Sequence, residues 1–80
     1  MNYPNTKEGK ATFVYDVINP LVQNEEHFDC ARYQEEGGRE YIVLYDFMGK
    51  PAAKINVTLD SVPALARDFC NQFLGILNKM

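Results

Sequence analysis

The fold is decided by the stretch REYIVLYDFMGKP, residues 39–51, because its apolar side chains occupy both positions of a two-residue alternation. Read as a β-strand, the stretch directs Ile42 and Leu44 to one side. The other side carries a larger, mainly aromatic set: Tyr41, Val43, Tyr45 and Phe47. A strand with two apolar sides needs cover on both, from its own chain or from a partner. If a partner covers the aromatic side, that side is a binding surface, so the question of what covers it bears directly on function.

Strands are also predicted on both sides of this stretch. HFDCARYQ, residues 27–34, precedes it, and Gly37-Gly38 supplies the positive φ angles of a tight hairpin turn. A second hairpin at Met48–Pro51 leads into AAKINVTL, residues 52–59, which alternates like a half-buried strand. If both turns have two residues, the numbers of paired residues sum to 75 in the first hairpin and to 99 in the second. Ile42 and Leu44 then share one face with Ala31, Tyr33, Ile55 and Val57.

A helix is predicted at the C-terminus, and a helix or a strand at the N-terminus. DSVPALARDFCNQFLGILNKM, residues 60–80, has a wide apolar half, with Asp60 or Ser61 as N-cap and Pro63 in the first turn. In residues 6–26, helical spacing of apolar residues and an Asn5–Glu8 capping pair favour a helix. The run TFVYDVI and Pro20 favour a strand instead. We expect one α+β domain over residues 1–80, in the order αβββα, whose sheet consists of two consecutive hairpins.

Composition narrows the function classes. The 80 residues are 46% hydrophobic and 24% charged, as in one small globular domain. Eleven acidic and eight basic residues give a net charge of -3, and the basic residues do not cluster, which disfavours nucleic acid as a partner. No segment resembles a signal peptide or a membrane span, so we expect a cytoplasmic protein with reduced cysteines and no membrane partner.

The second face of the sheet is the candidate binding surface, since an aromatic centre with a polar margin is typical of protein interfaces. The candidate partner-binding residues are Phe28, Arg32, Tyr41, Val43, Tyr45 and Phe47, with Glu35 and Glu36 at the margin. Three covers are considered for this face: the first helix, a second copy in a homodimer, or a different protein.

Catalytic chemistry is not indicated. His27 is the single histidine, and a strand would place it on the same side as Asp29 but opposite Cys30. No Cys-x-x-Cys pair occurs, so we predict no catalytic, cofactor-binding or metal-binding residue and no cofactor, and treat Cys30 and Cys70 as small buried apolar residues. Glutamates gather near the first strand, as a solvated loop or as a docking patch for a basic partner: Glu25, Glu26, Glu35, Glu36 and Glu40.

The element order is similar to that of double-stranded RNA-binding domains, which carry a basic cluster at the start of their last helix. Residues 61–65 contain no Lys or Arg, so we assign no family. The leading hypothesis is a small acidic, non-catalytic protein that binds another protein. It would act as a stoichiometric inhibitor or adaptor, such as a phage or mobile-element anti-defence protein directed at a nucleic-acid enzyme with a basic surface. The alternatives are a single-stranded nucleic-acid binder that uses the aromatic face and a small structural homodimer.

Overall fold

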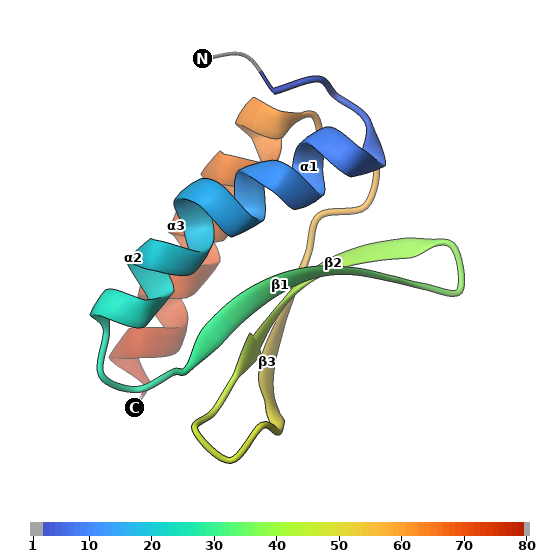
Figure 1. Cartoon of the computed structure of the whole chain (residues 1–80). Coiled ribbons are helices and arrows are strands. Elements are labelled where there is room, and N and C mark those ends of the chain that lie inside the picture. Colours follow the sequence, from blue (N-terminus) through green and yellow to red (C-terminus); the bar gives the residue numbers. More distant parts are fainter. Residues whose placement is uncertain (1–2, 80) are drawn as a thin grey trace.

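A computed structural model of the chain describes residues 3–79 and confirms the predicted α+β order. The elements are α1 (Lys7–Phe13), the π-helical turn η1 (Val14–Ile18), α2 (Asn19–Asn24), β1 (Cys30–Glu36), β2 (Arg39–Tyr45), β3 (Pro51–Asn56) and α3 (Val62–Asn78) (Figure 1). The three strands form one antiparallel sheet in the order β1-β2-β3.

The N-terminal segment is a helix, which decides between the two predicted alternatives. Its N-cap is Thr6, whose hydroxyl accepts the Gly9 N–H at 3.1 Å, in place of the predicted Asn5–Glu8 pair. The helix widens at η1, just before Pro20. Proline has no N–H to donate and its ring crowds the carbonyl four residues earlier, and π-turns and kinks relieve that crowding. The N-terminal helix, as we call α1, η1 and α2 together, therefore continues through Pro20.

The first hairpin has the predicted register. Cys30 pairs with Tyr45 and Glu36 with Arg39, so the residue numbers sum to 75 along the ladder. Gly37 and Gly38 have φ angles of 56° and 81°, in the left-handed region that glycine adopts without steric cost.

The second hairpin has a different register from the one predicted. Ile42 pairs with Ile55, so that residue numbers sum to 97 rather than 99, and an irregularity follows at Leu44/Tyr45. The reason is Asp46, whose side chain accepts the N–H groups of Met48 and Lys50 and closes a longer turn. A shift by two residues leaves each side chain on its predicted side.

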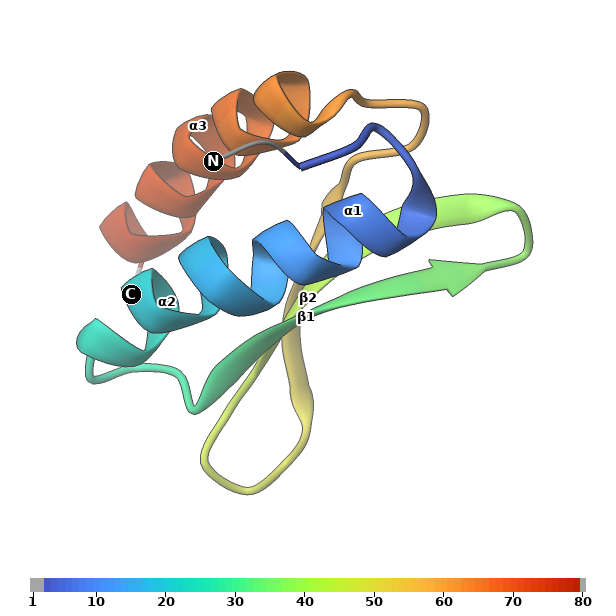
Figure 2. The same ribbon diagram turned by 45° about the horizontal axis from the view of Figure 1, so that its top comes forward.

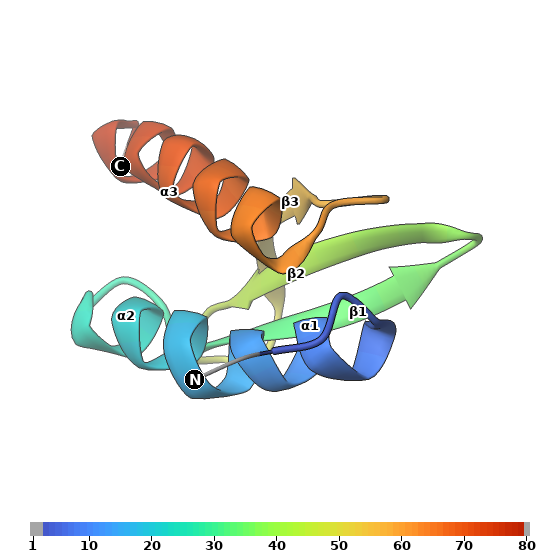
Figure 3. The same ribbon diagram turned by 90° about the horizontal axis from the view of Figure 1, so that it is seen from above.

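Both helices cover the same side of the sheet. The N-terminal helix lies along β1 and α3 lies along β3, side by side (Figures 2 and 3). The two helices meet one face of the sheet in a single core, whose fully buried side chains include Val14, Ile18, Val22, Ile42, Leu44, Ile55, Val57, Leu65 and Phe69. Among residues 3–79, no element covers the other face.

The structure contradicts the predicted positions of Phe28 and Cys70. Phe28 was assigned to the second face, but it is 2% exposed and its ring lies 6.2 Å from that of Phe73 in the core. β1 begins only at Cys30, so strand alternation does not apply to Phe28. Cys70 was expected to be buried but is exposed on α3, because the apolar half of that helix is wider than the surface it packs against.

Candidate functional site

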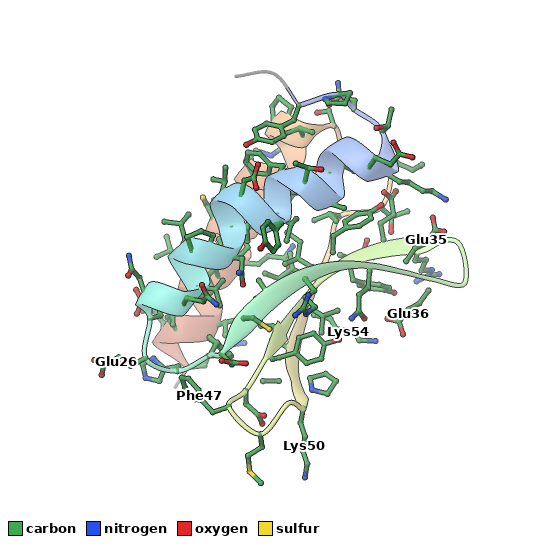
Figure 4. The ribbon with its side chains drawn as sticks, viewed as in Figure 1. Glu26, Glu35, Glu36, Phe47, Lys50 and Lys54 are labelled. Carbon is green, nitrogen blue, oxygen red and sulfur yellow. The ribbon has the colours of Figure 1, made fainter. Side chains whose placement is uncertain are left out.

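The candidate site is the side of the sheet that faces away from both helices, which we call the open face. Figure 4 shows Glu36 and Lys54 projecting from the sheet on this side. Strand alternation assigns it Cys30, Arg32, Gln34 and Glu36 from β1, Arg39, Tyr41, Val43 and Tyr45 from β2, and Lys54 and Asn56 from β3. The predicted candidates Arg32, Glu36, Tyr41, Val43 and Tyr45 therefore lie together.

Val43 forms the dry centre of the open face. It is 0% exposed although no helix covers it. Arg32 and Lys54 lie opposite it on the two neighbouring strands, and Tyr41 and Tyr45 precede and follow it on the same side of β2. Long amphipathic side chains can cover an apolar residue while their polar ends stay in water. The centre of the open face is thus covered by its own neighbours.

The two tyrosines of the open face are held by polar contacts. The Gln34 amide donates a hydrogen bond to the Tyr45 hydroxyl. The Lys54 ammonium lies 5.3 Å from the centre of the Tyr41 ring and 2.7 Å from Glu36 Oε2. The hydrogen bond to the Glu36 carboxylate raises the pKa of Lys54. Because Lys54 occupies one face of the Tyr41 ring, that ring is less available for stacking.

The open face has a positive balance on an acidic protein. Its cations are Arg32, Arg39 and Lys54, and its one carboxylate is Glu36, which pairs with Lys54. Arg32 and Arg39 are exposed and make no ion pair within the described part of the chain. Arg39 was not among the predicted residues, although its spacing of two from Tyr41 places it on the same side.

The acidic residues near β1 do not form one patch. Glu36 pairs with Lys54 on the open face, and Glu35 pairs with Lys7 on the side of the N-terminal helix. Glu40 is buried against Lys10. Glu25 and Glu26 lie apart from these pairs in the α2–β1 connection, where Figure 4 shows Glu26 at the far end from Glu35. Three of the five glutamates are therefore neutralised within the chain.

The buried pair of Lys10 and Glu40 connects three parts of the fold. The Lys10 Nζ lies 2.8 Å from Glu40 Oε1, and each residue is 6% exposed. Tyr33 donates its hydroxyl proton to Glu40 Oε1, and the Leu59 N–H donates to Oε2 at 3.0 Å. Burial raises the pKa of Glu40, but the hydrogen bonds from Lys10, Tyr33 and Leu59 outweigh burial and lower it to about 2. These contacts support a structural role that joins α1, the sheet and the β3–α3 loop.

Two exposed apolar side chains lie at one end of the sheet. Phe47 was predicted on the strand, but it lies in the β2–β3 turn, 65% exposed, next to Met48, which is 81% exposed. Figure 4 shows Phe47 and Lys50 at this turn, at the opposite end of the sheet from Glu35 and Glu36. Phe47 therefore extends from the end of the open face rather than from its centre.

The residues considered for catalysis lie at and just before the start of β1. His27 and Asp29 are exposed in the α2–β1 connection, and Cys30 is partly buried where β1 begins. Among residues 3–79, no group of three or more His, Cys, Asp or Glu side chains is placed to hold a metal ion. None of the helices in this part of the chain has the length and apolar composition needed to cross a membrane.

Two neighbouring carboxyl groups, those of Asp60 and Asp68, lie where the β3–α3 loop meets α3. The Asp60 Oδ2 is buried without a hydrogen-bond partner in the described residues, and the Asp68 carboxyl is its neighbour. Burial, together with the hydrogen bond and the negative charge of Asp68, raises the pKa of Asp60 to about 6. The same hydrogen bond lowers the pKa of Asp68.

Asp60→Asn is expected to stabilise the protein at neutral pH. The pKa of Asp60 is raised in the folded state. Protonated Asp60 therefore contributes fully to the free energy of unfolding below about pH 4, and this contribution is lost as the pH rises through about 6. An amide keeps the hydrogen bond to Asp68 without the second charge, so we expect a gain of about 1 kcal/mol at neutral pH and almost none near pH 4. Urea unfolding of the wild type and the variant at neutral pH and near pH 4 measures the two gains, and Asp29→Asn, at an exposed position, is the control. An equal gain at both pH values would contradict this assignment.

Comparison with protein-family models, with curated proteins and with solved structures finds no match to this chain.

Proposed function

We propose that the chain is a small non-catalytic protein that binds another protein through its open face, as a stoichiometric inhibitor or adaptor. One observation carries the proposal: both helices pack on the same side of the sheet, which leaves Tyr41, Val43 and Tyr45 without a covering element in residues 3–79. Tyrosine and arginine around a dry centre, with a polar margin, form the composition that is enriched in protein interfaces. Phe47 and Met48 add exposed apolar side chains that suit a pocket on a partner.

The charge expected on the partner differs between the part near Glu25 and Glu26 and the part that contacts the open face. A basic partner, such as a host nucleic-acid enzyme targeted by a phage or mobile-element protein, would be attracted to Glu25 and Glu26. The open face itself favours an acidic partner surface, because Arg32 and Arg39 have no ion-pair partner among residues 3–79. A partner that contacts the open face should therefore present carboxylates at these two arginines.

Single-stranded nucleic acid is the second candidate, favoured by the three cations and two tyrosines of the open face. Two features oppose it. Lys54 lies on one face of the Tyr41 ring, and the net charge of -3 repels phosphate at long range. The structural homodimer is also less favoured, because it would bring together two faces that both have a positive charge balance.

Tyr45→Asp is expected to weaken partner binding strongly while the protein remains folded. A central interface tyrosine contributes about 2 kcal/mol or more, which corresponds to a loss of affinity of roughly 30-fold. Affinity purification from the native cell, followed by titration of the captured protein, measures the loss. Leu74→Asp is the matched control, since Leu74 is 62% exposed on α3, on the other side of the sheet. Full binding by folded Tyr45→Asp would remove the open face from the proposal.

The two candidate ligands are separated by fluorescence anisotropy with labelled single-stranded oligonucleotides. The proposal expects no saturable binding at physiological salt. Salt-dependent binding that is lost in both Tyr45→Ala and Arg32→Ala would overturn the proposal in favour of nucleic acid. His27→Ala should leave protein binding unchanged, because His27 lies in the α2–β1 connection, outside the open face.

A further inference from the structure

The outer edge of β1 carries backbone groups without partners. The Ala31 N–H points away from β2 and donates to Asn19 Oδ1 at 2.8 Å. Backbone groups of alternate residues point the same way in an antiparallel strand, so the N–H groups of Tyr33 and Glu35 also face outward. Neither of these two has a hydrogen-bond partner among residues 3–79. Asn19 thus closes the start of the edge, and its middle stays open.

A groove follows this open edge. It has a volume of about 210 Å³ and lies between the N-terminal helix and β1. Its helix side is formed by Ala11, Val14 and Tyr15, and its strand side by residues 31–34. Tyr15 is 69% exposed, although it borders this groove. A groove between a helix and a free strand edge is the arrangement in which extended peptides bind by adding a strand to a sheet.

A second copy of this chain does not fit the edge by antiparallel pairing of β1 with β1. Antiparallel pairing of β1 with itself would relate the two copies by a twofold axis perpendicular to the sheet, so both N-terminal helices would lie on one side. The N-terminal helix lies over β1 (Figure 3), and adjacent strands are only about 4.8 Å apart, whereas packed helices need about 8–10 Å. The edge therefore admits a strand that carries no helix above it.

We propose that the outer edge of β1 binds an extended segment of another protein as a fourth strand, with apolar side chains toward Ala11 and Tyr15 and a carboxylate toward Arg32. The free N–H groups of Tyr33 and Glu35 supply the donors that such a segment needs. Side chains of an added strand alternate between the two sides of the sheet, so apolar and acidic residues should alternate in the segment. The charged side chains of the segment should be acidic, because Arg32 is exposed and has no ion pair in residues 3–79. This site goes beyond the proposed function, since it requires no contact with the centre of the open face.

Glu35→Pro and Glu35→Ala together test the site. Both substitutions remove the ion pair with Lys7, but only proline removes the outward N–H. Proline is tolerated at an edge position whose N–H makes no ladder bond, so the sheet should persist, which a two-dimensional NMR spectrum verifies. The probe is a displayed library of random peptides selected against the folded wild-type protein. We expect enrichment of sequences with alternating apolar and acidic residues.

The selected peptides should bind Glu35→Pro about tenfold more weakly than wild type, and Glu35→Ala within about twofold. Arg32→Glu should also weaken binding, whereas Tyr45→Asp should not, which separates this site from the proposed function. On peptide addition, amide exchange should slow at Tyr33 and Glu35. Absence of an alternating consensus, equal affinity for Glu35→Pro and Glu35→Ala, or loss of binding in Tyr45→Asp would each overturn the proposal.

Discussion

Lys10→Ala should lower the free energy of unfolding by about 3–5 kcal/mol, because it leaves the Glu40 carboxylate buried without its cation. The two side chains are 2.8 Å apart and almost fully enclosed, so water cannot replace the lost ammonium without opening the fold. The free energy of unfolding of a small domain is only about 5–15 kcal/mol, so the Lys10→Ala variant should be close to unfolding at room temperature. Urea unfolding followed by circular dichroism measures the change.

Two controls identify the cause of this loss. Lys7→Ala removes an ion pair with Glu35 at the surface and should cost at most about 1 kcal/mol. Combining Lys10→Met with Glu40→Gln removes both charges and should recover a large part of the stability lost in Lys10→Ala. A cost below about 1 kcal/mol for Lys10→Ala itself would show that Glu40 is hydrated, contrary to the structure.

The same pair predicts the response to acid. The pKa of Glu40 is lowered to about 2 in the folded state, so its contribution is present above its ordinary pKa of 4.5 and is lost as the pH falls toward 2. Removing Lys10 takes away a hydrogen bond and a positive charge that hold this pKa down. In the Lys10→Ala variant, the free energy of unfolding should therefore fall less between neutral and acidic pH than it does in the wild type.

Phe69→Ala is expected to cost about 3–5 kcal/mol, as the loss of a large aromatic side chain from a packed core usually does. Phe69 is 1% exposed, and its ring stacks on Phe73 with the ring centres 4.9 Å apart. Leu74→Ala on the same helix should change stability by no more than about 0.5 kcal/mol, since its side chain is mostly in water. Thermal or urea unfolding compares the two. Similar costs at both positions would mean that α3 meets the sheet with another face.

The sequence predicts the parts of this fold that depend on local geometry. Gly37-Gly38 defines the first turn and therefore the register of β1 with β2. The apolar spacing in residues 60–80 predicts α3, and Ser61 is its N-cap, as expected. Two-residue alternation also groups Arg32, Tyr41, Val43 and Tyr45 correctly, and this grouping survives a register error of two residues in the second hairpin.

Features that depend on long-range contacts are not predictable in this way. Alternation shows which residues share a face, but an amphipathic helix can pack on either face, so the position of the N-terminal helix stayed open. The Lys10–Glu40 pair joins residues 30 positions apart, and no local pattern indicates it. No neighbouring residue in the sequence indicates a partner for Glu35 or Glu36, although each pairs with a lysine from another element. Of the two interpretations of these glutamates, a solvated loop or a docking patch, the patch does not form as one surface for this reason.

Both helices share one face of the sheet and leave the open face uncovered, and the proposed function rests on this arrangement. Nuclear Overhauser contacts of the valine, leucine and isoleucine methyl groups test it directly in solution. Ile42 and Leu44 should show contacts to Ile18 and Phe69. The Val43 methyl groups should show contacts only to strand residues such as Tyr41, Tyr45, Arg32 and Lys54. Contacts from Val43 to the N-terminal helix or to α3 would contradict the account.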